Sequence, residues 1–222
     1  MRVFRRQMTG ALAAGALAGV VLFLIQWILI APLIRQADTY ERLDAVHADG
    51  RADAGWEPSD GFERIAYTGV GTVLAGVGFG TFFFGVASLI GVDLNARTGL
   101  WMGAAGFFCF AIVPSIGLPP KPPGVPGPTV QAAQLWWVTA AACSCVALWV
   151  FTHAGRSKGR LGISALALAV PFLIGAPPAQ ASSVVPLALV WRFAAISIAT
   201  RAVFWMTLGV AGGRMMHGCD RA

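Results

Sequence analysis

The side chains suited to metal binding are concentrated in one segment of the chain. Eight of the ten acidic residues lie between positions 38 and 63, and one of the three histidines lies among them. Carboxylate and imidazole groups are ligands for borderline divalent ions such as Co²⁺ and Ni²⁺. The candidate ligands of this segment are Asp38, Glu41, His47 and Asp49. The alternative is an ordinary solvated segment whose acids pair with its own arginines.

A second group of ligand types occurs in the C-terminal tail. The sequence MMHGCD, residues 215 to 220, contains sulfur, imidazole and carboxylate groups within six positions. Such a tail would receive a metal on the cytoplasmic side, with His217 and Cys219 as candidate ligands. The alternative is a short tail in which these residue types fall together by chance.

Three cysteines lie inside apolar runs and make a weaker case for metal binding. Cys143 and Cys145 are two residues apart, which on a helix is a rotation of about 200°, so they do not face the same way. Cys109 lies on another apolar run and can meet only one of them. We interpret all three as small buried apolar residues.

Composition indicates that these residues are positioned by membrane helices. The 222 residues are 57% hydrophobic and only 12% charged, whereas soluble domains have about 25% charged residues. Each uncharged stretch is long enough for a helix of about 20 residues across the bilayer. The predicted helices are residues 8 to 33, 65 to 90, 98 to 118, 133 to 152, 161 to 177 and 188 to 213.

These helices predict an all-α fold, a polytopic transmembrane bundle in which residues 1–222 form a single integral membrane domain. The fifth helix is short, contains Pro171 and ends in Ala-Pro-Pro. It is therefore expected to be tilted, broken or re-entrant, and five crossings are the alternative to six.

The basic residues predict the orientation of the bundle. With a cytoplasmic N-terminus, nine of the sixteen lysines and arginines lie on the cytosolic side, as the positive-inside rule requires. The first apolar stretch is too long for a signal peptide and is interpreted as a retained anchor. Residues 35–64 then form an extracytoplasmic acidic loop, and an even number of helices places both termini in the cytoplasm.

Several classes of function are excluded by the sequence. The net charge of +6 arises from basic residues that flank apolar runs, with no basic face carrying interleaved aromatics, so nucleic acid is not an expected partner. The chain has no H-E-x-x-H, P-loop or G-x-S-x-G motif and no paired intramembrane carboxylates. We therefore expect no enzymatic activity and no permanently bound cofactor, and the lipid bilayer is the first expected partner.

A proline-rich connector separates the third and fourth predicted helices. Residues 117–132 contain six prolines, all between positions 119 and 128, and proline neither donates a backbone hydrogen bond nor continues a helix. Trp136 and Trp137 follow it, at the depth where indole rings sit in the wet interface. The connector is either a stiff surface loop with an aromatic belt, or a lid over a pore or partner surface.

Arg201 is the one charge near the middle of a predicted span. It follows Arg192 by nine residues, a rotation of about 180°, so the two arginines point to opposite sides of the helix. A charge at this depth needs backbone carbonyls, water or a polar neighbour such as Gln26 or Thr200. Because a fixed positive charge repels Co²⁺, we expect Arg201 to anchor or gate the bundle instead of lining a cation path.

Four helices carry glycines four residues apart, which predicts close packing of their backbones. The same faces would equally serve a homo-oligomer or a small membrane partner. The pairs are Gly15 and Gly19, Gly76 and Gly80, Gly99 and Gly103, and Gly209 and Gly213.

Several segments in order along the chain resemble the CbtA family of probable cobalt transporter subunits. They are APLIRQADTYE, GFERIAYTGVGTVLAGVGFG, GLPPKPPG followed by QLWW, PFLIGAP and WRFAAISIAT. The resemblance implies an inner-membrane protein of about five helices that imports cobalt for cobalamin synthesis. It also implies a partner, CbtB, a one-helix protein with a histidine-rich tail. Cobalt would then be the transported substrate.

Two positions depart from the family pattern, with Lys121 where an acid is expected and Phe172 where a histidine is common. Both changes remove potential metal ligands. The alternative function is a membrane scaffold or assembly protein that transports nothing.

Overall fold

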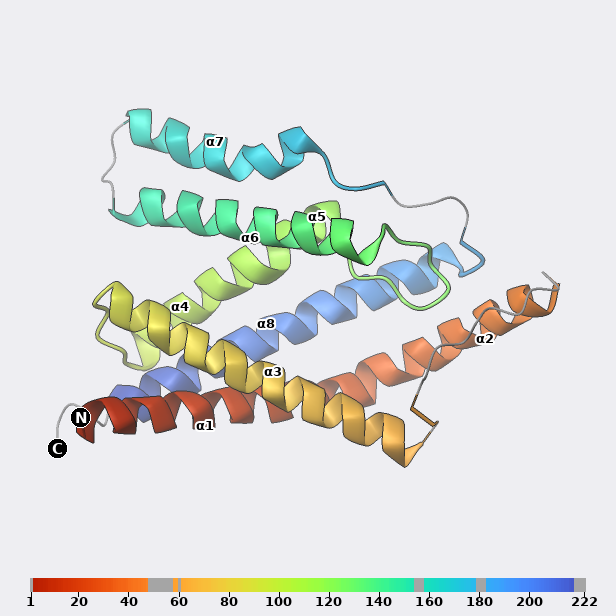
Figure 1. Cartoon of the computed structure of the whole chain (residues 1–222), viewed down its shortest axis with the longest axis horizontal. Helices are drawn as coiled ribbons and strands as arrows, with labels where there is room; N and C mark the ends of the chain where they lie inside the picture. The colour runs from red at the N-terminus through yellow and green to blue at the C-terminus, as the bar shows by residue number, and fades with distance from the viewer. Residues whose placement is uncertain (1, 48–57, 60, 154–157, 179–182, 218–222) are drawn as a thin grey trace.

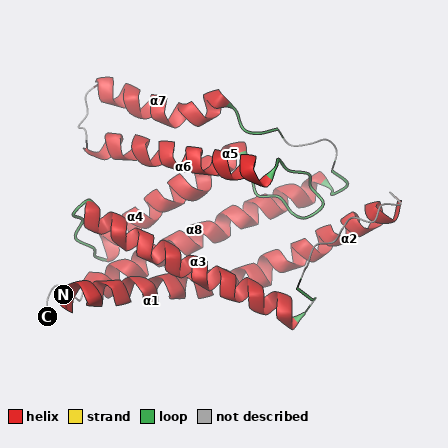
Figure 2. Cartoon of the chain, viewed as in Figure 1, coloured by secondary structure: helices red, strands yellow, loops and turns green. Residues whose placement is uncertain are grey.

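The computed structural model describes residues 2–47, 58–59, 61–153, 158–178 and 183–217, and all regular secondary structure in these ranges is helical. Six helical rods pass back and forth along a common direction (Figures 1 and 2). The first and third rods are each built of segments that run end to end. The segments are α1 (Arg2–Ile25), η1 (Gln26–Ile30) and α2 (Ala31–His47); α3 (Phe62–Leu89); α4 (Ala96–Phe107), η2 (Phe108–Ile112) and α5 (Val113–Gly117); α6 (Val130–His153); α7 (Lys158–Ile174); and α8 (Leu187–His217). The predicted all-α polytopic bundle is confirmed.

Five of these rods are long and apolar enough to cross a membrane, and the chain is a multi-pass membrane protein. They are Arg5–Leu43, Phe62–Leu89, Ala96–Gly117, Val130–Thr152 and Leu187–Met216. The remaining rod, α7, has 17 residues, a length of about 26 Å, slightly less than the roughly 30 Å hydrocarbon core. It runs beside α6 at one side of the bundle (Figure 1). The fifth predicted helix is therefore present as α7, and it is short.

Both termini lie at the same end of the bundle, where α3 gives way to α4 (Figure 1). The proline-rich connector and the link from α7 to α8 lie at the opposite end. This arrangement is the one expected for an even number of rods.

The first helix extends much further than predicted. Residues 35 to 47, predicted as part of a loop, are helical and form most of α2. Their sequence, RQADTYERLDAVH, contains no glycine or proline, and oppositely charged residues four apart, such as Asp38 and Arg42, favour a helix. The prediction was wrong here because a change from apolar to charged composition was equated with the end of the helix.

Two π-helical turns occur at the same distance before a proline. η1 ends two residues before Pro32, and η2 ends two residues before Pro114. Proline inside a helix removes one N–H group and crowds the carbonyl four residues earlier. The wider π turn adjusts the backbone just before that crowding, so each rod continues through its proline.

The glycine pairs make two close helix contacts. α1 packs on α3 through Gly15, Gly19, Gly76 and Gly80, and a methyl group on Gly76 would lie 2.5 Å from the Gly15 carbonyl oxygen. α4 packs on α8 in the same way, through the two remaining pairs, at Gly99 and Gly103 on one side and Gly209 and Gly213 on the other. Each of the four predicted glycine faces therefore packs against another helix of the same chain.

Candidate functional site

A central cavity of about 270 Å³ lies between η1, α8 and the proline-rich connector. It is lined by Gln26, Ile30, Pro120, Lys121, Phe193, Ser197, Thr200 and Arg201. This set contains two basic side chains, three neutral polar side chains and no acidic one. The described lining of the central cavity therefore carries only positive charge.

Arg201 enters this cavity from the middle of α8. It lies 14 residues from the start of that helix, a distance of about 21 Å along the axis. Within the described part of the chain, its guanidinium forms no hydrogen bond or ion pair. Gln26 and Thr200, the polar neighbours expected from the sequence, line the same cavity, but the Thr200 hydroxyl donates to the Ser197 carbonyl at 3.0 Å.

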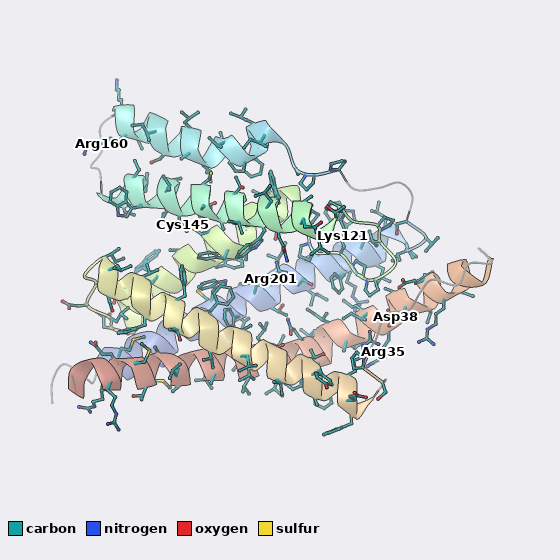
Figure 3. The ribbon with its side chains drawn as sticks, viewed as in Figure 1. Arg35, Asp38, Lys121, Cys145, Arg160 and Arg201 are labelled. Atoms are coloured by element: carbon teal, nitrogen blue, oxygen red, sulfur yellow. The ribbon has the colours of Figure 1, made fainter. Side chains whose placement is uncertain are left out.

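Lys121 enters the cavity from the connector. Its Nζ donates a hydrogen bond to the Pro126 carbonyl at 3.1 Å, and the side chain is half-buried. Lys121 and Arg201 are both labelled in Figure 3, one on the connector and one on α8. The connector is thus folded over the central cavity, with its one charged residue directed inward.

The bundle is tightly packed one turn beyond Arg201. Trp205 is buried, and its ring lies 5.3 Å from Phe79 and 5.5 Å from Phe110 between centroids. Because residues four apart share a helix face, these rings lie next to the central cavity on the side of the chain termini. The cavity is therefore lined by the connector through Pro120 and Lys121, and the aromatic cluster lies one helical turn from Arg201 along α8.

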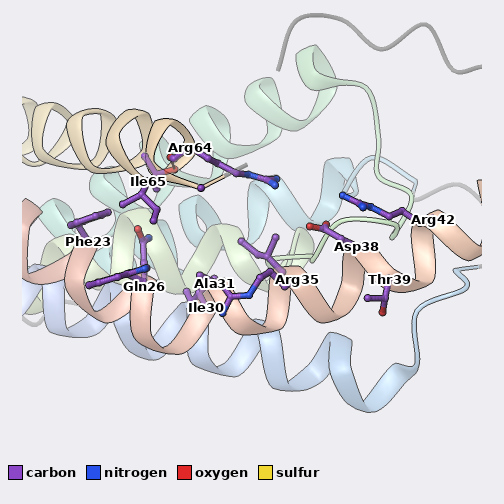
Figure 4. A pocket seen from close by; sticks show the side chains of 14 residues that line it. Phe23, Gln26, Ile30, Ala31, Arg35, Asp38, Thr39, Arg42, Arg64 and Ile65 are labelled. Carbon is purple, nitrogen blue, oxygen red and sulfur yellow. Dashed lines mark hydrogen bonds between the residues drawn. The ribbon is translucent and has the colours of Figure 1, made fainter. Parts of the chain in front are cut away.

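A larger outer cavity of about 670 Å³ lies between the first rod and the start of α3 (Figure 4). Its charged lining consists of Arg35, Arg42, Arg64 and a single acid, Asp38. Figure 4 shows the Asp38 and Arg42 side chains near each other on α2. Gln26 lines both this cavity and the central one. The described charged lining of the outer cavity is mostly basic, so Asp38 is not part of a purely acidic site.

The predicted metal ligands are only partly placed by the structure. Asp38 is half-buried on α2, and Glu41 is exposed beside the connector, where a methyl group on Gly124 would lie 3.3 Å from its Cβ. His47 and His217 end their helices with side chains outside the described set, and Asp49 and Cys219 lie outside the described residues altogether. Among the described residues, no three His, Cys, Asp or Glu side chains are grouped so that they would hold one metal ion.

One acid of the predicted cluster has a structural partner. Glu63, in the first turn of α3, accepts a hydrogen bond from the Ser59 N–H at 3.1 Å and another from the Ser59 hydroxyl. A carboxylate in this position also interacts favourably with the helix N-terminus. Glu63 thus contributes to the start of α3.

Comparison with known proteins identifies the family. The model of the family described as "Probable cobalt transporter subunit (CbtA)" matches residues 4–217. The chain belongs to the CbtA family. Neither a curated protein nor a solved structure matches it. The matched region extends from the first turn of α1 to the end of α8, so it covers the helical bundle described above.

In this CbtA chain the indole N–H groups of the two tryptophans after the connector donate to backbone carbonyls of the preceding rod. Trp137 Nε1 donates at 3.3 Å to the Phe110 carbonyl, the carbonyl that would have paired with the missing N–H of Pro114. Trp136 is buried and donates at 3.3 Å to the Pro114 carbonyl. The aromatic-belt interpretation is wrong for these indole N–H groups, because η2 and α5 offer carbonyl acceptors within reach.

The cysteines of the CbtA bundle pair across helices as the spacing allowed. The thiols of Cys109 in η2 and Cys145 in α6 lie near enough to interact with each other. Cys143 lies on a different face of α6 and does not join them. Two thiols give a metal ion only half of a tetrahedral ligand set, so we retain the packing interpretation.

Sequence reasoning named Gln26 as a neighbour of Arg201 but missed Lys121, the second basic residue of the central cavity. Lys121 was noted only because the family pattern has an acid at this position. It is also the one charged residue among the six prolines, which was a signal that the connector folds inward. Gln26 interrupts an apolar run six residues before Pro32. A polar residue at the start of a π turn is a recognisable signal, since such turns are frequent at functional sites.

Proposed function

We propose that this chain is the membrane-embedded subunit of a cobalt uptake system in the inner membrane and that it works with a small single-helix partner of the CbtB type. The family match over residues 4–217 carries the proposal. Five apolar membrane-crossing rods support it, because an ion pathway through lipid needs a multi-helix bundle.

The proposed orientation places both termini in the cytoplasm. The end of the bundle that carries the termini exposes six basic residues: Arg5, Arg6, Arg97, Lys158, Arg160 and Arg214. Basic residues next to membrane helices favour the cytosolic side. The opposite end, with residues 38 to 63, would then face outward, and its eight acids would concentrate cations at the entrance.

In this proposal the partner supplies metal ligands. Transition metals bind through sets of nitrogen, oxygen or sulfur ligands, and the described residues of this chain bring no three such side chains together. A histidine-rich segment on a small partner would complete the ligand set. The bundle would provide the path and the attractive outer surface.

The test is cellular uptake of radiolabelled cobalt in a strain that lacks this chain, its partner or both. The proposal expects uptake to fall in each deletion and to return only when both proteins are restored. Nickel and zinc serve as competing ions for selectivity. Unchanged cobalt uptake, combined with the loss of another membrane complex, would instead support the scaffold alternative.

A further inference from the structure

We propose that the central cavity binds a small oxyanion, a phosphate or carboxylate group, between Arg201 and Lys121. The ligand has the opposite charge to the proposed substrate, so the site is additional to the cobalt path. The group would come either from a free anion or from the headgroup of a phospholipid. The two basic side chains reach the cavity from different elements, one from α8 and one from the connector.

The hydrogen-bonding capacity of the cavity fits an anion. The Arg201 guanidinium has five N–H donors, none of them used by a described residue. Lys121 uses one donor on the Pro126 carbonyl and retains two. The lining also includes the Gln26 amide and the Ser197 hydroxyl, which would donate to the remaining oxygens of a bound phosphate.

The charge balance points the same way. Two cations in one cavity of a membrane bundle repel each other and have lost part of their hydration. Among the residues that the structure describes, no carboxylate lines the cavity to neutralise them. Arg201 lies about 21 Å along α8 from the helix start, so its charge lies in the interior of a membrane-crossing helix and not at its end. An anion held by both side chains would remove the repulsion and form charge-assisted hydrogen bonds.

The cavity also has a size and a boundary suited to a small group. Its volume of about 270 Å³ is sufficient for a phosphate with a few waters. Pro120 and Lys121 line it on the connector side, and Phe193, Ser197, Thr200 and Arg201 line it on α8. A bound anion would lower the positive potential that a passing divalent cation experiences, so its occupancy would adjust cobalt passage.

The experiment measures thermal unfolding of the purified full-length chain in uncharged detergent while inorganic phosphate is titrated at constant ionic strength with chloride. We expect phosphate to raise the unfolding temperature of the natural chain in a saturable way. Arg201→Gln and Lys121→Gln should each weaken the apparent affinity by about tenfold to a hundredfold, because each removes charge-assisted hydrogen bonds. Arg192→Gln is the matched control, since Arg192 is exposed on the same helix and does not line the cavity.

A second arm distinguishes the source of the anion. Phosphatidylglycerol or phosphatidylcholine is added to the same samples, and retained lipid is measured by native mass spectrometry. Saturation by inorganic phosphate supports a free anion, and retention of phosphatidylglycerol that Lys121→Gln abolishes supports a headgroup. If Arg201→Gln does not fold, Lys121→Gln decides alone. No response to either probe, or equal responses in Lys121→Gln and Arg192→Gln, overturns the proposal.

Discussion

Replacing Gly76 with alanine should separate α1 from α3. A methyl group at this position would lie 2.5 Å from the Gly15 carbonyl oxygen and 2.8 Å from the Gly19 Cα, whereas ordinary contacts are 3.4–4 Å. Because both neighbours are backbone atoms, no side chain can move aside. The two helices must therefore move apart by roughly 1 Å along this contact, which forfeits up to about half of the local dispersion energy.

The expected loss of stability follows from that displacement. Overpacking of a tight contact costs about 1–3 kcal/mol, and the higher helix propensity of alanine returns up to about 1 kcal/mol. We expect a net destabilisation of about 1–2 kcal/mol, a factor of about 5 to 30 in the folding equilibrium. Membrane helices associate mainly through such close packing, so the loss has no hydrophobic compensation.

The assay is unfolding of the purified chain in mixed micelles as the fraction of denaturing detergent is raised, followed by tryptophan fluorescence. Gly78→Ala is the matched control, because Gly78 lies on the same helix with nothing within 4 Å of the added methyl group. That variant should be as stable as the natural chain or up to about 1 kcal/mol more stable. Equal midpoints for Gly76→Ala and Gly78→Ala would refute the proposed glycine packing between α1 and α3.

Three further predictions concern the tryptophans, the acidic end and the topology. Trp137→Phe should destabilise the chain by about 1–2 kcal/mol, because it leaves the Phe110 carbonyl unpaired. The control Trp101→Phe should have little effect, because Trp101 is 69% exposed. The destabilisation by Trp137→Phe should be smaller in a Pro114→Ala background, which restores the missing N–H, and equal destabilisation in both backgrounds would contradict this pairing. Asp38→Asn with Glu41→Gln should reduce cobalt uptake several-fold at low ionic strength and less at high salt, since salt screens exposed charges; a reduction independent of salt would exclude electrostatic attraction. Reporter fusions after residue 60 should be extracytoplasmic and those after residue 95 cytoplasmic, and the reverse pattern would contradict the proposed orientation.

The fold was largely predictable because lipid imposes a simple rule on sequence. Uncharged stretches of about 20 residues marked every rod except the last, which contains Arg192 and Arg201, and glycines four residues apart marked both close helix contacts. The boundaries at α2 were less predictable, because the charged residues after Ile34 still favour a helix once it has left the apolar region. The π turns before Pro32 and Pro114 were also missed, since they respond to local crowding that residue counting does not reveal.

The candidate site was less predictable because it depends on which distant segments meet. Arg201 was recognised from its depth alone, and Gln26 and Thr200 were named as neighbours. Lys121 was not placed near Arg201, because 80 residues separate them and the connector was expected to lie on the surface. The roles of the two tryptophans were missed for the same reason, since the carbonyls that they bind belong to another helix.

Reconstitution provides the most direct test of the central claim that this chain belongs to a cobalt pathway through the membrane. Purified chain is incorporated into liposomes with its partner, and cobalt entry is followed with a metal-sensitive dye trapped inside. We predict that cobalt enters liposomes that contain both proteins and that entry falls to the level of empty liposomes when this chain is left out. Equal entry with and without the chain would contradict the account.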